Sequence, residues 1–152
     1  MRTPTSQLDF FVDSLPAKPY CTNNLEQGLL IRPKVQAMEM KYIQPNTPWN
    51  WTWITEDVDR ETGASDWYDR GCPAPNVISE NPYNGHAHLF YGLATPIHLQ
   101  DGRRNKPFRY ASAISVALTK QLGADPAYSG LISKNPLNAH WNNDWLDPKP
   151  YT

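Results

Sequence analysis

One stretch of the chain reads Trp53-Ile54-Thr55-Glu56-Asp57-Val58-Asp59-Arg60 and ends an aromatic and aliphatic run with two aspartates. If the run forms a strand, its side chains alternate between faces, so Asp57 and Asp59 project from the same side. Two neighbouring carboxylates repel each other unless a cation lies between them. Such oxygen ligands suit Mg²⁺ or Mn²⁺, which support two-metal phosphoryl transfer. The same pair also fits a solvated polar turn after a strand.

A second informative stretch begins with the turn Asn81-Pro82-Tyr83-Asn84-Gly85 and continues as His86-Ala87-His88-Leu89-Phe90-Tyr91-Gly92-Leu93. Alternation places His86 and His88 on one face of the expected strand. A histidine there can donate to a phosphate or ligate a metal ion. A lone histidine is more often a packed surface residue, but two on one face, after a carboxylate pair, favour a functional role for at least one.

Length and composition limit the class of protein. The 152 residues fit one domain, and a net charge of −1 gives no global sign of nucleic-acid binding. The one dense basic stretch is Arg103-Arg104-Asn105-Lys106-Pro107-Phe108-Arg109. Cys21 and Cys72 lack metal-ligand spacing, which favours a reduced intracellular chain. The sequence has no apolar run of membrane-spanning length and no signal-peptide pattern, so we expect a cytoplasmic protein without a membrane partner.

The order of helix-like and strand-like segments along the chain favours an α+β domain with one mixed, mainly antiparallel sheet flanked by helices. The 15 prolines argue against a helical bundle and indicate short elements. The clearest helix spans residues 106–122, because Pro107 fits its first turn and Gly123 follows its end. Further helices are expected over residues 7–15 and 35–42. Strands are expected over residues 29–32, 51–57, 77–79, 86–93, 128–133 and 141–146.

Several blocks of the sequence together resemble a known family. They include Lys18-Pro19-Tyr20-Cys21-Thr22-Asn23, Asp57-Val58-Asp59-Arg60, Asp69-Arg70-Gly71-Cys72-Pro73-Ala74-Pro75-Asn76, Asn81 to His88, and Tyr128 to Pro136. In order and spacing they resemble the Rep (replicase) family of plasmid replication initiators of colicin-type theta plasmids. That family is similar to the archaeo-eukaryotic primases, which place a DxD motif, a histidine motif and a third acid on one sheet.

The resemblance implies a primase-polymerase (RRM-like) catalytic core and a template-dependent primase that uses Mg²⁺ or Mn²⁺. Its substrates would be nucleoside triphosphates, its template the DNA of a plasmid origin, and the host replicative polymerase a partner. It also implies that residues 1–152 are the catalytic domain of a longer replication protein whose origin-binding part follows.

The resemblance also implies roles for individual residues. Asp57 and Asp59 fall on the catalytic, metal-binding pair, and His88 falls on the histidine that contacts the phosphates of the incoming nucleotide. Two positions depart from the family pattern. Glu56 stands where an apolar residue is expected, and His86 replaces the usual serine, so the nucleotide contact is expected to be modified.

The third acid is chosen among three candidates. We favour Asp144 as a catalytic and metal-binding residue, because it enters or leaves a short expected strand. Asp125 follows the helix-capping Gly123 and fits a turn acid, and Asp101 fits a solvated loop.

Basic residues are candidates for binding nucleotide phosphate or the template backbone. Lys106 and Arg109 begin the expected helix near one face and are favoured for nucleotide binding. Arg103 and Arg104 fit ordinary loop charges somewhat better, and Lys134 is a further phosphate candidate.

Two other classes of function compete. In a histidine-hydrophobic-histidine nicking endonuclease, His86 and His88 would bind a metal and Tyr110 would attack DNA, which leaves Asp57 and Asp59 without a role. A non-catalytic origin-binding domain is the second alternative, although near-neutral charge argues mildly against it.

Overall fold

The computed structural model describes residues 6–99, 105–146 and 149–152. Its helices are α1 (Gln7–Ser14), α2 (Lys34–Ala37) and α3 (Lys106–Leu122), with a 3-10 turn, η1, at Leu25–Gln27. The larger sheet has the order β4-β6-β5-β8, and the smaller sheet has the order β2-β1-β3-β7. All the ladders between these strands are antiparallel.

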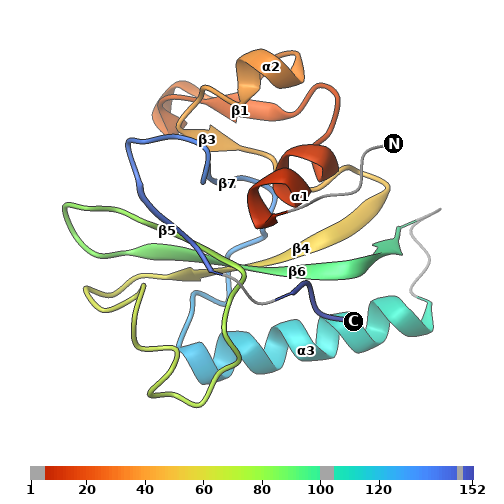
Figure 1. The fold of residues 1–152 in the computed structure, drawn as a ribbon, viewed down its shortest axis with the longest axis vertical. Coiled ribbons are helices and arrows are strands. Elements are labelled where there is room, and N and C mark those ends of the chain that lie inside the picture. The colour runs from red at the N-terminus through yellow and green to blue at the C-terminus, as the bar shows by residue number, and fades with distance from the viewer. Residues whose placement is uncertain (1–5, 100–104, 147–148) are drawn as a thin grey trace.

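The strands differ greatly in length. The larger sheet is formed by β4 (Asn50–Val58), β5 (Val77–Glu80), β6 (Ala87–His98) and β8 (Asn142–Trp145). The smaller sheet is formed by β1 (Tyr20–Thr22), β2 (Leu30–Ile31), β3 (Tyr42–Ile43) and β7 (Ser133–Lys134). Figure 1 shows α3 along one face of the larger sheet, and α1 with the smaller sheet on the other.

The two faces of the larger sheet bury different cores. Ile54 and Val58 of β4 pack with Leu118 and Leu122 of α3. On the opposite face, Trp53 joins a second core that includes Phe11 of α1. Because side chains of a strand alternate, Glu56 belongs to the α3 face, and Thr55 and Asp57 belong to the face of Trp53. The alternation therefore directs Asp57 toward the space between the sheets.

The ends of α3 explain why its sequence prediction is accurate. The side chain of Asn105 accepts a hydrogen bond from the Phe108 N–H, and Pro107 occupies the first turn. At the other end, Gly123 has φ 64°, a left-handed conformation that favours glycine. The helix spans Lys106–Leu122, as predicted, and its final turn lies beside the end of β4.

The α+β class is confirmed, but several details differ from expectation. The single mixed sheet is replaced by two antiparallel sheets. The expected helix over 35–42 ends at Ala37, because the Asn135 side chain binds the carbonyls of Met38 and Met40. The expected strand over 128–133 is mostly turn, with φ 77° at Gly130, and only β7 is strand there.

Both cysteines are free and buried. No helix in the described parts of the chain is both long and apolar enough to cross a membrane.

Candidate active site

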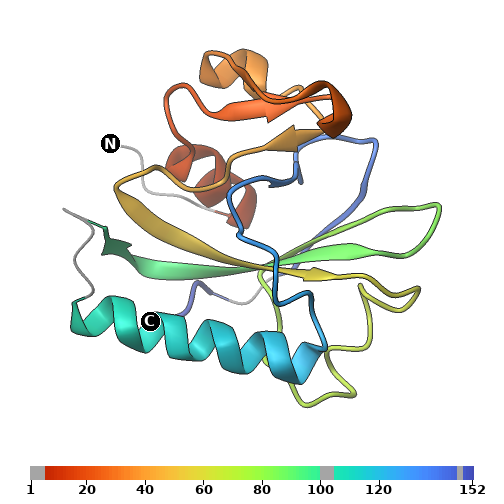
Figure 2. The same ribbon diagram turned by 180° about the vertical axis from the view of Figure 1, so that it is seen from behind.

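Three carboxylates meet where β4 ends. Asp57, Asp59 and Asp125 each offer an oxygen, and these oxygens lie within 4.8 Å of one another. Asp57 is the penultimate residue of β4, Asp59 directly follows this strand, and Asp125 follows the end of α3. The main-chain N–H of Asp125 donates to the Asp57 carbonyl at 2.8 Å, which fixes the two segments together. Figure 2 shows the chain that leaves α3 passing β4 on its way to β7.

Asp57 and Asp59 influence each other's protonation. Burial acts to raise the pKa of Asp57, but hydrogen bonding and charge from His88, together with the charge of Lys134, outweigh it and lower the pKa. Partial burial and the negative charge of Asp57 raise the pKa of Asp59. An acidic cluster of this kind favours a cation, and oxygen-only ligands suit Mg²⁺ or Mn²⁺.

His88 is buried next to Asp57 and is not exposed to solvent. Its Nδ1 accepts the main-chain N–H of Lys134 at 2.9 Å, and its Nε2 lies 3.4 Å from the Asp57 carboxylate. The ring stacks on Tyr128 with centroids 5.0 Å apart. Burial lowers the pKa of His88, which favours the neutral ring. Because Nδ1 is an acceptor, the single ring proton is on Nε2 and faces Asp57.

This arrangement differs from the phosphate contact expected for His88, since both ring nitrogens already have partners. The other histidine, His86, places its Nδ1 3.4 Å from the Asp59 carboxylate. The two histidines therefore face different aspartates and do not point at a common ligand. Tyr110, the nucleophile required by a nicking endonuclease, is 72% exposed in the first half of α3, the half remote from Asp125.

Lys134 adds a positive charge beside the carboxylate cluster. Burial lowers its pKa, while the negative charges of Asp57 and Asp59 act in the opposite direction. Its ammonium lies 5.4 Å from the centre of the Trp141 ring, a cation–π contact. A cation held by packing at this position can meet a phosphate that approaches the carboxylates.

The structure brings Asp125 rather than Asp144 to the pair, so our choice of the third acid is corrected on geometry. Asp144 is exposed on β8, where it is opposite Ile78, and two strands, β6 and β5, separate β8 from β4. Its neighbour Asn143 is opposite Ser79, in the row that contains His88 and Asp57. Asp144 therefore belongs to the opposite face of the sheet. The turn role expected of Asp125 is also present, because its Oδ1 accepts the Ala127 N–H.

Lys106 and Arg109, the basic residues favoured for nucleotide binding, do not join this cluster. Lys106 and Arg109 are exposed in the first turn of α3, and Asp125 follows the last turn. A helix of 17 residues is roughly 25 Å long, which separates these side chains from the carboxylates. Arg103, Arg104 and Asp101 lie outside the described residues.

Glu56 is a buried acid whose environment the sequence did not reveal. It is 3% exposed and accepts hydrogen bonds from Thr119 and Ser115 of α3. Burial raises its pKa to about 7. Ser115 and Thr119 are four residues apart, so they share a helix face. This spacing of small polar residues on an otherwise apolar helix face is the signal that could have identified their polar partner.

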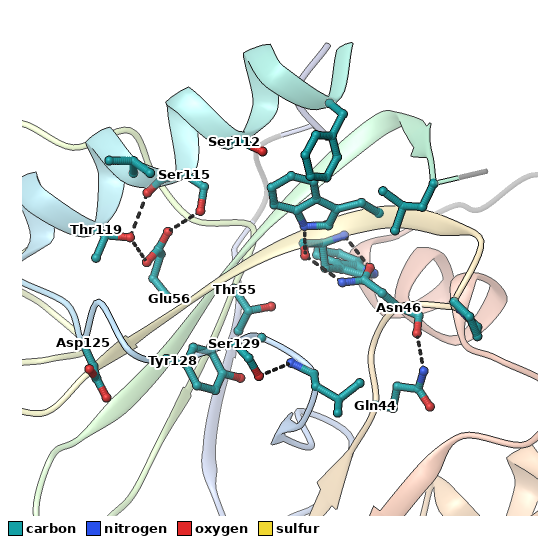
Figure 3. Close-up of a pocket in the computed structure, with 18 of the residues that line it drawn as sticks. Gln44, Asn46, Thr55, Glu56, Ser112, Ser115, Thr119, Asp125, Tyr128 and Ser129 are labelled. Atoms are coloured by element: carbon teal, nitrogen blue, oxygen red, sulfur yellow. Dashed lines mark hydrogen bonds between the residues drawn. The ribbon is translucent and has the colours of Figure 1, made fainter. Parts of the chain in front are cut away.

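A cavity of about 740 Å³ opens beside the cluster, along the outer edge of β4. Figure 3 shows Asp125 and Tyr128 at one end, Ser112, Ser115 and Thr119 of α3 along one wall, and Gln44 and Asn46 opposite. Thr55 lies between these walls. The cavity and the carboxylates thus form one continuous candidate site.

Comparisons with known proteins agree with this fold. The AEP domain of the primase-polymerase (PrimPol) of cyanophage S-2L matches with a TM-score of 0.54 at 11% identity, over 78% of this chain and 72% of that one. At this identity the likeness concerns the fold. No curated protein matches the sequence closely enough to count as a relative. The model of the Replicase family matches residues 14–152, and the chain therefore belongs to the Replicase family.

Proposed function

We propose that this domain is a template-dependent, metal-dependent primase-polymerase that makes a short primer at a plasmid origin for the host replicative polymerase to extend. The observation that carries the proposal is the meeting of Asp57, Asp59 and Asp125 within 4.8 Å. Family membership and the fold shared with a primase-polymerase domain support it.

The donor set fits a divalent ion such as Mg²⁺ or Mn²⁺. Asp57, Asp59 and Asp125 would hold it, since carboxylate oxygens are the ligands that these hard ions prefer. When bound, such ions lower the pKa of an attacking 3′-hydroxyl and neutralise charge on the leaving pyrophosphate.

The protein's own side chains supply orientation and charge. His88 donates its Nε2 proton toward Asp57 and holds that carboxylate in place, while the Lys134 N–H fixes the ring. The Lys134 ammonium is positioned to balance phosphate charge near Asp57 and Asp59. His86, beside Asp59, is a second group that can donate to a phosphate oxygen.

The nicking alternative has less support. It needs two histidines around one metal and a nearby tyrosine, whereas His88 has both nitrogens engaged and Tyr110 lies in the remote half of α3. A non-catalytic origin-binding role gives no reason for three carboxylates to converge.

Primer synthesis by the purified domain tests the proposal. The reaction would contain single-stranded DNA template, nucleoside triphosphates and Mn²⁺ or Mg²⁺, with no host primase. We expect labelled products that a chelator abolishes and that Asp57→Asn does not make. Asp144→Asn is the matched control and should retain synthesis. Synthesis by Asp57→Asn at the wild-type rate would contradict the catalytic assignment.

A further inference from the structure

A second cavity, of about 320 Å³, lies between α3 and β6 on the other face of the larger sheet. Ile54 lines it and belongs to the α3 face, whereas Asp57 belongs to the opposite face, so the sheet separates this cavity from the carboxylate cluster. Among the described residues that line it there is no charged side chain. Much of the lining is aliphatic and comes from Ile54, Leu93, Ile97, Ile114 and Leu118.

The outward face of α3 adjoins this cavity at the protein surface. Residues three or four apart share one face of a helix. The outward face of α3 is formed by the exposed residues Lys106, Tyr110, Ala113, Ala117 and Lys120. Tyr110 also lines the cavity and is 72% exposed. The outward face of a surface helix is usually polar, but here its middle is apolar and its cations lie toward the two ends.

The charges of this surface indicate what would complement it. Lys106 and Arg109 precede the apolar part of α3 and Lys120 follows it, whereas neither α3 nor β6 contains an acidic residue. The net charge of the whole chain is −1, so the excess of cations is local. A complementary partner carries apolar side chains with carboxylates on either side of them. A second copy of α3 lacks this complementarity, because cations would meet cations at both ends.

The edge of β6 argues against a partner that adds as a strand. Tyr151 already uses this edge, because its N–H donates to the Gly92 carbonyl and its own carbonyl accepts the N–H of Ala94. Pro96 follows, and proline has no N–H to pair with an added strand. A helix satisfies its main-chain groups internally and needs only a groove for its apolar side chains. The cavity between α3 and β6 provides such a groove for a large anchoring side chain.

We propose that this surface binds an acidic amphipathic helix of a partner protein, which inserts a large apolar side chain into the cavity between α3 and β6. Tyr110 and the cavity hold the apolar face of that helix, and its carboxylates pair with Lys106, Arg109 and Lys120. Because the sheet separates this surface from the carboxylate cluster, the partner binds without blocking the proposed active site.

Selection from a peptide display library tests this surface. Random peptides of about 16 residues, enough for roughly four helical turns, would be selected for binding to the protein. We expect the selected peptides to share large apolar residues at helical spacing, flanked by acidic residues. Tyr110→Glu should weaken their binding by about tenfold or more in fluorescence anisotropy, because it places a carboxylate beside the cavity. Tyr68→Glu is the matched control and should leave binding unchanged, because Tyr68 is 75% exposed and does not line the cavity.

Three results would overturn the proposal. The first is selected peptides that are basic or share no pattern, and the second is peptides that bind Tyr110→Glu as tightly as the wild type. The third is a failure to select any peptide, together with binding of a single-stranded DNA oligonucleotide that Tyr110→Glu weakens, which would assign the surface to nucleic acid. Melting temperatures establish that the variants are folded. If Tyr110→Glu is not, Ala117→Glu replaces it, because Ala117 is exposed on the same face of α3.

Discussion

Two groups of charged side chains adjoin the same turn after β4, and they are built in opposite ways. In the carboxylate cluster, Asp57, Asp59 and Asp125 approach one another within 4.8 Å. A few residues away, the carboxylate of Asp66 lies between two arginines, with N–O distances of 3.0 Å to Arg60 and 3.3 Å to Arg70.

The group formed by Arg60, Asp66 and Arg70, here called the arginine group, has an evident structural role. Arg60 also donates to the carbonyls of Leu122 and Gly123, so it joins the turn after β4 to the end of α3. The negative charge of Asp66 is paired with both arginines, and the guanidinium of Arg60 finds all its partners within the protein. The carboxylate cluster, in contrast, holds more negative charge than its histidines and Lys134 balance. Opposite charges paired within the fold indicate a structural contact, whereas like charges brought together indicate a site for something that the fold itself does not supply.

The largest expected effect comes from the cluster. Asp57→Asn should reduce primer synthesis by more than about 100-fold, because changing even an outer-shell partner of a metal ligand typically costs 10- to 100-fold. Asp59→Asn should behave similarly and leave the melting temperature unchanged or slightly higher, since carboxylate repulsion is relieved. Asp66→Asn is the control, and it should keep synthesis while losing stability. If Asp57→Asn and Asp66→Asn lost activity equally, the contrast between the two groups would be wrong.

A second comparison sharpens the identity of the third acid. Asp125→Asn should lower synthesis by about 100-fold, whereas Asp144→Asn should have no effect, because only Asp125 meets the pair. The asparagine at position 125 still accepts the Ala127 N–H, so the turn is preserved. Initial rates at saturating nucleotide, together with melting temperatures, provide the measurement. A larger loss for Asp144→Asn would restore the original prediction.

The difference between these two acids shows what the sequence could and could not predict. The pair Asp57 and Asp59 was predicted because strand alternation is a local property. The third acid depends on which distant segment meets the end of β4, and that is settled by the contact between Asp125 and Asp57. For Asp144, the register of β8 against β5 decides on which face of the sheet the side chain lies. A shift of this register by one residue would move every side chain of β8 to the other face. The helix α3 was predicted because its proline and glycine signals are also local.

The role of His88 gives the next prediction. His88→Ala should weaken Mn²⁺ binding by about 10- to 100-fold, because the ring orients Asp57 from behind. The affinity for nucleotide should fall only as much as the affinity for Mn²⁺ falls. Raising the Mn²⁺ concentration should therefore restore nucleotide binding. Calorimetric titrations of Mn²⁺, and of nucleotide at two Mn²⁺ concentrations, give the readout. Nucleotide binding that stays weak at saturating Mn²⁺ would instead support the direct phosphate contact expected from the sequence.

The smallest effect concerns the arginine group. Burial acts to raise the pKa of Asp66, but hydrogen bonds from Arg60 and Thr62 and the charges of Arg60 and Arg70 lower it overall. A lowered carboxyl pKa stabilises the fold above the ordinary value of 3.8, and this stabilisation is lost as the pH falls through the folded-state pKa. Asp66→Asn should therefore cost about 1–2 kcal/mol at neutral pH, since the pair is partly exposed.

Urea unfolding of Asp66→Asn and the wild type between pH 7 and strongly acidic pH measures this difference. The two stability curves should converge as the pH falls, because protonation removes the same charge that the substitution removes. Curves that stay parallel would show that the carboxylate charge of Asp66 does not stabilise the fold.

The claim that Asp57, Asp59 and Asp125 form a divalent-metal site is tested most directly by anomalous X-ray scattering from crystals grown with Mn²⁺. We expect an anomalous peak within coordination distance of all three carboxylates, which disappears in crystals of Asp57→Asn. The control variant Asp144→Asn should retain the peak. Crystals at saturating Mn²⁺ with no peak at this position, or with a peak that persists in Asp57→Asn, would contradict the assignment of this cluster as the metal site.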